Sequence, residues 1–331
     1  MGDDALDGQH SRSPSGIGGG PRVRQPRELP PSPPPLTAEA ATNKLRTLGV
    51  EVFDAATNAD MSWDSLAGYD HVKREIEETV INSLLHPDVY DKIAKNTRVA
   101  FESNRPKAIL LEGPPGTGKT LTARVLASRC GRPLIHLKLE DFVSKWYGES
   151  EKKLASIFDA CDALEGAIIF IDEVDAVAGN RNSSNMHEAT RRILSVVLQR
   201  VEGFKGKGKS LLICATNRRR DLDAALLSRF DLSIHFTLPD FDTRKKIFAR
   251  YARQFGGADA AQQVALDKLA EATSGLSCRD IKEACEHAER QLASKLIREN
   301  DQATDAQVPT VDNYLKCIRA RRGPVSGAVQ A

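Results

Sequence analysis

Five short apolar runs between residues 107 and 238 alternate with segments in which apolar residues recur at helical spacing. The runs cover residues 107–112, 134–139, 167–171, 210–214 and 232–238. Residues 167–171 are apolar without interruption, which is typical of a strand buried on both faces of a sheet. Between two runs, Leu154, Phe158 and Cys161 lie three or four positions apart and predict a helix over residues 149–164. The alternation predicts an α/β fold with a five-stranded parallel sheet between helical layers.

After Pro239 the strand pattern stops and only helical patterns follow. They cover residues 243–254, 266–273, 278–299 and 311–321. We therefore expect a large α/β domain over residues 61–240, a small all-helical domain over 241–323 and a flexible tail over 324–331. Residues 37–60 are predicted to form a linker with one short helix, at 38–48.

The first 36 residues have a different composition from the rest of the chain. They hold eight of the 16 prolines and the run Gly18–Gly20, and they offer few apolar side chains for a core. Such a segment cannot bury enough apolar surface to offset its ordering entropy, so residues 1–36 are predicted to be a disordered tail. They also lack the apolar core of a secretory signal.

Charge and cysteine usage exclude several classes of protein. The 331-residue chain has a formal net charge of +2, without the strong basic excess of proteins that bind nucleic acid by bulk charge, so no nucleic-acid partner is expected. Its six cysteines form no Cys-x-x-Cys pair, which is typical of buried thiols in a reducing compartment. With no apolar run of 18 residues, no transmembrane segment is predicted. The expected location is the cytoplasm, with the nucleus or an organelle as alternatives.

A glycine-rich loop follows the first apolar run directly. Its residues are Gly113, Pro114, Pro115, Gly116, Thr117, Gly118, Lys119 and Thr120, which match the pattern G-x-x-x-x-G-K-[ST] between a strand and a helix. Glycines let backbone N–H groups turn toward phosphate oxygens, and the following helix presents its positive end to them. Lys119 can reach the β and γ phosphates of ATP, and the Thr120 hydroxyl can bind Mg²⁺. ATP and Mg²⁺ are therefore the expected cofactors.

Two later strands end in polar residues that suit hydrolysis. The run 168–171 ends in Asp172 and Glu173, where Asp172 can hold Mg²⁺ and Glu173 can activate water as a general base. Carboxyl ends of strands in such a sheet open onto the ligand crevice. The next strand ends at Asn217, whose amide can orient the water, although asparagine is also common in turns.

These motifs together resemble the AAA ATPases over about residues 63–321. The segments that carry the resemblance are 113–120, 168–176, 215–218, 221–223 and 228–231. The resemblance implies a phosphate-loop NTPase αβα sandwich followed by a helical lid, assembled as a homo-hexameric ring with ATP sites between subunits. Residues 63–68, which end in Gly68, resemble the family's adenine-side loop.

The same resemblance assigns two further roles and shows one departure. Asn217 would be the sensor of the γ phosphate, and Arg229 would be a finger that reaches the neighbouring subunit's nucleotide. Many relatives have two arginines here, whereas Ser228 precedes Arg229 and Leu232 and Ser233 follow Asp231. Arg191 and Arg192 could assist across the interface.

An aromatic pair lies on a polar segment before the helix 149–164. Trp146 and Tyr147 are followed by Gly148 and flanked by charged or small residues. Aromatics on a polar loop more often mark a partner contact than core packing. The segment is similar to the first pore loop of spastin, katanin and the mitochondrial outer-membrane protein extractors, which implies that it grips a polypeptide substrate.

Three functional hypotheses follow from these patterns. The first is an ATP-driven remodeller that pulls polypeptides through a hexameric pore, with any membrane contact made through an adaptor. The second is a microtubule-severing ATPase, which the resemblance to katanin and spastin permits. The third is a weakly hydrolysing, nucleotide-gated scaffold, which the absence of a second arginine beside Arg229 permits.

Overall fold

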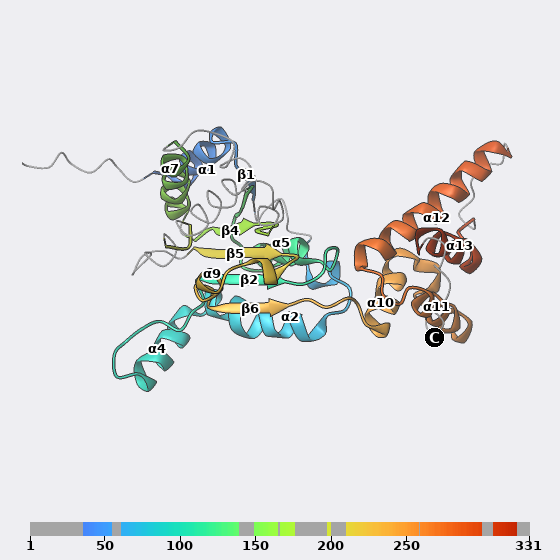
Figure 1. Cartoon of the computed structure of the whole chain (residues 1–331), viewed down its shortest axis with the longest axis horizontal. Helices are drawn as coiled ribbons and strands as arrows, with labels where there is room; N and C mark the ends of the chain where they lie inside the picture. The colour runs from blue at the N-terminus through green and yellow to red at the C-terminus, as the bar shows by residue number, and fades with distance from the viewer. Residues whose placement is uncertain are drawn as a thin grey trace, which may run out of the picture. The chain divides into compact units, whose positions relative to one another are not determined.

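The sheet of this protein has six strands in the spatial order β1-β3-β4-β5-β2-β6 (Figure 1). The computed structural model describes residues 36–54, 61–138, 149–164, 166–175, 197–199, 210–257, 259–299 and 307–322. The strands are β1 (Glu51–Phe53), β2 (Ala108–Glu112), β3 (Leu134–Leu137), β4 (Ile168–Ile171), β5 (Leu211–Thr216) and β6 (Leu232–His235). β2 to β6 run parallel to one another, which confirms the predicted five-stranded parallel sheet.

The sixth strand was not predicted. β1 lies within residues 37–60, which were expected to form a linker with one helix, and it pairs antiparallel with β3 at the edge of the sheet, with Val52 opposite Ile135. An ion pair and a hydrogen bond hold its first residue, since Glu51 lies 2.6 Å from Lys138 Nζ and 3.2 Å from His136 Nδ1. A three-residue strand has no periodicity of its own, so its partner strand determines it.

Helices cover both faces of the sheet, as the αβα architecture requires. Before β6 the chain forms the helices α1 (Ala38–Thr47), α2 (Asp70–Ile76), η2 (Glu77–Ile81), α3 (Asn82–Leu85), α4 (Pro87–Thr97), α5 (Lys119–Arg129), α7 (Glu149–Ala163) and α9 (Ala224–Leu227), with short 3-10 turns η1 (Trp63–Ser65) and η3 (Arg219–Asp221). In β4, Ile169 faces a core shared with α1 and α7, whereas Phe170 faces a core shared with α2 and α5. This alternation is the two-residue period of a strand buried on both faces.

All elements described after β6 are helical, in agreement with the sequence pattern. They are α10 (Phe241–Tyr251), η4 (Arg253–Phe255), α11 (Ala260–Ala272), α12 (Cys278–Arg298) and α13 (Val311–Arg322). They share a core of their own around Phe248, Leu269 and Tyr314. The described residues belong to one unit, Leu36–Ala331, so the domain boundary predicted at residue 240 stays a prediction.

Several predictions concern residues that the structure does not describe. Residues 1–35 and 323–331, which hold most of the two predicted tails, lie outside the described ranges.

All six cysteines are described and carry free thiols, and five of them are buried. Burial raises the pKa of Cys130 to about 11 and that of Cys161 to about 12. Within the described residues, no helix combines the length and the apolar character that crossing a membrane requires.

Candidate nucleotide-binding site

The phosphate loop lies between β2 and α5, and its glycines have backbone conformations that other residues rarely adopt. Gly113, Gly116 and Gly118 have φ values of 136°, 75° and 103°. A Cβ on Gly113 would lie 2.0 Å from the carbonyl oxygen of Phe236, and one on Gly116 would lie 2.6 Å from Ser277 Oγ. The loop therefore needs glycine both for its turn and for the close approach of neighbouring segments.

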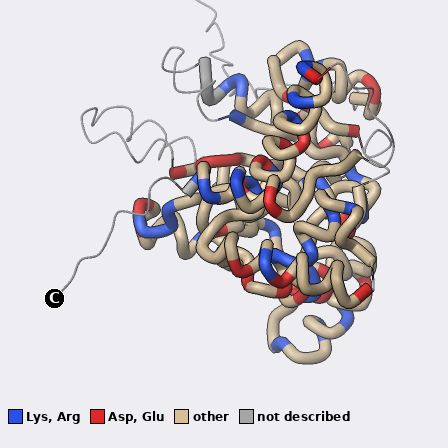
Figure 2. Tube along the Cα trace, turned by 90° about the vertical axis from the view of Figure 1, so that its right-hand side faces the viewer, with Lys and Arg blue, Asp and Glu red and all other residues tan. Residues whose placement is uncertain are grey.

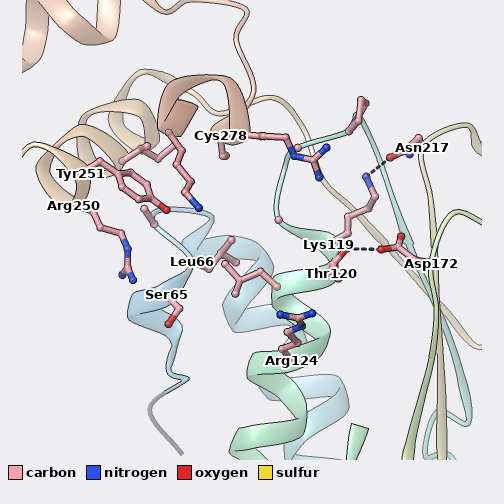
Figure 3. A pocket seen from close by; sticks show the side chains of 18 of the residues that line it. Ser65, Leu66, Lys119, Thr120, Arg124, Asp172, Asn217, Arg250, Tyr251 and Cys278 are labelled. Atoms are coloured by element: carbon pink, nitrogen blue, oxygen red, sulfur yellow. Dashed lines mark hydrogen bonds between the residues drawn. The ribbon is translucent and has the colours of Figure 1, made fainter. Parts of the chain in front are cut away.

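Lys119, the first residue of α5, has three acceptors at the root of this loop. Its Nζ donates to the carbonyl oxygens of Gly113 (2.8 Å) and Pro114 (2.9 Å). It also donates to Asn217 Oδ1 at 2.8 Å (Figure 3). Burial lowers the pKa of Lys119, an effect that the nearby carboxylates of Asp172 and Asp175 oppose. The site thus holds a desolvated ammonium group that an anionic ligand would stabilise in its charged form.

The end of β4 places two carboxylates beside α5. Thr120 Oγ1 donates to Asp172 Oδ2 at 2.6 Å, and the backbone N–H of Glu173 donates to Asp172 Oδ1 at 2.9 Å (Figure 3). Glu173 has a φ of 49°, a left-handed conformation that is sparsely populated outside glycine and clusters at functional sites. Its side chain is exposed and lines the same cavity as Asp172.

The end of β5 brings Asn217 next to Lys119. Its backbone N–H donates to Asp175 Oδ1 at 2.9 Å, and Thr216 Oγ1 donates to the same oxygen at 2.8 Å. Asp175 is buried, with 6% of its surface exposed. This aspartate was not predicted as a site residue, because its partners are 41 and 42 positions away in the sequence.

Lys119, Thr120, Asp172, Glu173 and Asn217 line one cavity of about 600 Å³. Its lining residues are Ser65, Leu66, Ala67, Pro115, Gly116, Gly118, Lys119, Thr120, Leu121, Arg124, Asp172, Glu173, Asn217, Ile247, Arg250, Tyr251, Cys278, Arg279 and Lys282. Five of these side chains are cationic and two are carboxylates, so the cavity favours an anion. Its volume lies within the range of small-molecule and cofactor pockets.

One wall of the cavity is apolar and comes from three segments that are distant in the sequence. Leu66 and Ala67 follow η1, whereas Ile247 and Tyr251 belong to α10 and Cys278 begins α12 (Figure 3). A wall of this kind suits the flat base of a nucleotide, and the cations elsewhere in the cavity suit its phosphate groups. The backbone N–H of Arg279 donates to the carbonyl oxygen of Gly116 at 3.1 Å, so the start of α12 contacts the phosphate loop.

The predicted site residues fall into three groups. Those that line the cavity are Pro115, Gly116, Gly118, Lys119, Thr120, Asp172, Glu173 and Asn217. Those that lie outside its lining are Gly68, Gly113, Pro114, Thr117 and Arg229. The rest, Trp146, Tyr147 and Gly148 together with Arg191 and Arg192, lie outside the described residues.

Gly68 has a packing role in the described structure. It has a φ of 70°, and a Cβ there would lie 2.4 Å from Thr243 Oγ1 on α10. Its neighbours Leu66 and Ala67 line the cavity instead. A direct contact between Gly68 and nucleotide stays a prediction.

Arg229 is exposed just after α9, where its backbone N–H donates to Leu226 O at 3.2 Å. The adjacent segment is fixed to the sheet, since Asp231 Oδ2 accepts from the backbone N–H groups of Lys107 (2.7 Å) and Ala108 (2.9 Å). Arg229 does not line this chain's own cavity. Its action on the nucleotide of a neighbouring subunit stays a prediction.

The fold and the cavity together define a phosphate-loop nucleotide-binding protein with a helical C-terminal part. Residues 109–238 match the family model described as "ATPase family associated with various cellular activities (AAA)". Residues 109–238 therefore form a domain of this AAA family.

Similar proteins agree with this assignment. The chain is 35% identical over 277 residues to the proteasome-activating nucleotidase of Methanopyrus kandleri, a match that covers 82% of this chain and 58% of that protein. It is 34% identical over 235 residues to the katanin p60 ATPase-containing subunit A1 of Arabidopsis thaliana, which covers 68% and 42%. The matched segment thus spans about half the length of these two relatives.

Among solved structures, the fold is similar to the FIGL-1 AAA domain in complex with ADP. The TM-score is 0.65 and the sequence identity 26%, and the match covers 83% of this chain and 89% of that one. These comparisons confirm the family and the fold that the sequence predicted.

Four cationic side chains of the cavity were not predicted as site residues. They are Arg124 on α5, Arg250 on α10, and Arg279 and Lys282 on α12. Arg124 also stacks over the ring of Phe53 in β1, with 4.7 Å between the guanidinium carbon and the ring centroid. Arg279 and Lys282 lie three positions apart on one helix, so helical spacing alone could have grouped them.

Proposed function

We propose that this chain hydrolyses ATP with the help of Mg²⁺. The single observation that carries the proposal is the convergence of Lys119, Thr120, Asp172, Glu173 and Asn217 on one cationic cavity. Each has a side chain suited to one part of phosphoryl transfer to water. The similar FIGL-1 AAA domain forms a complex with ADP, which supports the choice of nucleotide.

The residues around Thr120 fit a magnesium ion. Its hydroxyl and the Asp172 carboxylate lie 2.6 Å apart as hard oxygen ligands, and the described residues hold no cluster of three metal-binding side chains. This suits Mg²⁺, which uses one or two protein oxygens together with phosphates and water. When bound there, Mg²⁺ neutralises charge on the β and γ phosphates.

The other side chains would perform the remaining steps. Lys119 exchanges its carbonyl acceptors for phosphate oxygens, and the Asn217 amide accepts from the attacking water and orients it. Glu173, exposed into the cavity, takes the proton from that water as its oxygen forms the bond to the γ phosphorus and the bond to the leaving ADP oxygen breaks. Charge accumulates on the phosphoryl oxygens, where Lys119 stabilises it.

We further propose that a homo-hexamer uses this hydrolysis to remodel polypeptides. The similarity to a proteasome-activating nucleotidase supports that class of activity. In this assembly Arg229 would reach the neighbouring nucleotide, and Trp146 and Tyr147 would grip the substrate. The similarity to katanin p60 favours microtubule severing as the second candidate function.

The test is steady-state ATP turnover with a matched pair of variants. Glu173→Gln removes the base and keeps the side chain's size, whereas Glu271→Gln makes the same change at an exposed position on α11 outside the cavity. The proposal predicts that Glu173→Gln lowers kcat by about 10²-fold or more while ATP still binds, and that Glu271→Gln matches the wild type. Equal turnover in the wild type and Glu173→Gln would contradict it and favour the weakly hydrolysing scaffold.

Substrate class needs a separate measurement. Trp146→Ala combined with Tyr147→Ala should abolish substrate processing and leave most ATP turnover intact. Unfolding of a tagged model polypeptide and severing of labelled microtubules, measured in parallel, distinguish the two candidate functions. Processing that persists in the double variant would remove the proposed pore loop.

A further inference from the structure

A carboxylate lies buried at the root of the phosphate loop. Glu112 ends β2, immediately before Gly113, and only 9% of its side chain is exposed. Its backbone oxygen accepts from Phe236 N–H at 2.7 Å, which fixes it to the segment after β6. Burying a carboxylate costs free energy unless it is paired with a cation or hydrogen-bonded. The partners of Glu112 therefore indicate its role.

The main partner of Glu112 comes from the segment that carries Asn217. Arg219 Nη1 lies 2.8 Å and 2.7 Å from the two carboxylate oxygens of Glu112, and the exposed His235 lies 3.4 Å from one of them. Arg219 follows Asn217 by two residues, in the 3-10 turn η3. A charge-assisted pair of this length is among the stronger polar contacts in a protein.

Asn217 is therefore held from two sides. On one side Asp175 accepts hydrogen bonds from Thr216 Oγ1 and from the backbone N–H of Asn217. On the other side Glu112 holds Arg219. Between these two anchors the Asn217 amide oxygen accepts from Lys119 Nζ at 2.8 Å.

Neither Glu112 nor Arg219 belongs to the cavity lining, so neither has a direct route to the nucleotide. Their pairing joins the strand that leads into the phosphate loop to the turn that follows the sensor strand. Catalytic groups must be held close to their productive geometry, and a displacement of about 1 Å can cost a large factor in rate. The pair therefore has the right place to control the Asn217 amide.

We propose that Glu112 and Arg219 are positioning residues that hold the Asn217 side chain within hydrogen-bond distance of Lys119. Their ion pair then sets the rate of ATP hydrolysis and leaves nucleotide affinity unchanged. This inference rests on the proposed ATPase function. It adds to that function two residues outside the cavity, which act through the sensor.

The experiment is a double-mutant cycle between Arg219 and Asn217, with Arg220→Ala as the matched control. Arg220 is an exposed arginine of the same 3-10 turn, next to the one that pairs with Glu112, whereas Arg219→Lys keeps a charge and tests rescue. We would measure kcat and KM for ATP, and the Kd for ADP by calorimetry, in each variant. The ADP Kd also reports whether the site is folded.

Arg219→Ala should lower kcat about tenfold and change neither KM nor the ADP Kd beyond about twofold. In the Asn217→Ala background the same substitution should cause no further loss, because the two residues act as one unit. Glu112→Gln should behave like Arg219→Ala, Arg219→Lys should recover part of kcat, and Arg220→Ala should match the wild type.

Three results would overturn the inference: an equal loss of kcat in both backgrounds, a rise in KM or ADP Kd that accounts for the loss, or the same loss in Arg220→Ala. Failure of the proposed function looks different, because the wild type and Glu173→Gln would then turn over ATP equally. In that case the positioning role falls with it.

Discussion

The two sides of the cavity hold their charges in different ways. On the sheet side Lys119 has three acceptors, and Asp172 and Asn217 have partners at hydrogen-bond distance. On the helical side the cations are exposed, and the pair of Lys282 with Glu286 is 3.6 Å long. Arg250 donates to the backbone oxygen of Asp64. The sheet side therefore holds its polar groups in fixed positions, as the proposed catalysis requires, whereas the exposed cations of the helical side are suited to bind an anion.

This contrast separates two kinds of effect. Substitutions on the sheet side should lower kcat, because preorganised groups stabilise the charge that develops in the transition state. The cations of the helical side are Arg250, Arg279 and Lys282. Substituting them should weaken nucleotide affinity, because these cations would interact equally with bound ATP in the ground state and in the transition state. Basic and acidic residues are interspersed along the described trace, so the excess of cations around the cavity is a local feature (Figure 2).

Lys119→Ala should have the largest effect, since Lys119 is expected to contribute both to kcat and to nucleotide affinity. We expect kcat to fall by about 10²- to 10³-fold, because in the proposed complex the buried Lys119 ammonium stabilises charge on the transferred phosphoryl group. ATP affinity should fall as well. Turnover measurements and calorimetric titration with ATP check this. Normal ATP binding in Lys119→Ala would break the assignment of the phosphate site.

Arg279→Ala should have an intermediate effect confined to affinity. Its guanidinium lines the cavity, and its backbone N–H already contacts Gly116, so the substitution removes charge without removing the loop contact. We expect the Kd for ADP to rise about tenfold, in line with the loss of one charged hydrogen bond. At saturating ATP, kcat should stay near the wild-type value. A large loss of kcat would place Arg279 on the catalytic side of the comparison.

Ser277→Ala should have the smallest effect, on stability. Ser277 and Asp280 form a reciprocal cap at the start of α12, so its loss should cost about 1 kcal/mol in the free energy of unfolding. Urea unfolding of both proteins at neutral pH checks the value. An unchanged unfolding midpoint would show that the cap contributes nothing to the helical side.

The same cap predicts a pH dependence with a defined sign. Burial raises the pKa of Asp280, but hydrogen bonds from Ser277 and the pairing with Arg321 outweigh it and hold this pKa below its usual range. A depressed carboxyl pKa stabilises the fold at pH values above the unfolded pKa, and this stabilisation disappears as pH falls through the folded value. As the pH falls from neutral through the range in which carboxyl groups titrate, Asp280→Asn should therefore lose less stability than the wild type. Parallel losses would contradict the pairing.

The sequence predicted most of the sheet because its strands are locally encoded. The continuous apolar run that ends at Ile171 needs burial on both faces, wherever its partners lie. β1 has only three residues and exists through its pairing with β3, so no local pattern indicates it. Helices over residues 70–97 were not predicted either, although Val72, Ile76 and Val80 recur at helical spacing and are fully buried.

The site shows the same division. The phosphate loop and the Asp172–Glu173 pair consist of consecutive residues, so their positions at the ends of β2 and β4 could be predicted. Arg279 reaches the cavity only because α12 packs against the phosphate loop, 163 positions away from Gly116 in the sequence. The pairing of Glu112 with Arg219 spans 107 positions and depends on which strand ends lie side by side. Sequence patterns predict local geometry, and contacts of this range require the fold.

The most direct test compares Asn217→Ala with Arg279→Ala in one set of measurements of kcat and ADP Kd. We predict that Asn217→Ala lowers kcat by about 10²-fold with an unchanged Kd for ADP, and that Arg279→Ala raises this Kd with an almost unchanged kcat. The two sides of the cavity would then differ in function as they differ in structure. If both variants lost kcat and affinity in the same proportion, the division between a catalytic side and a capturing side would be wrong.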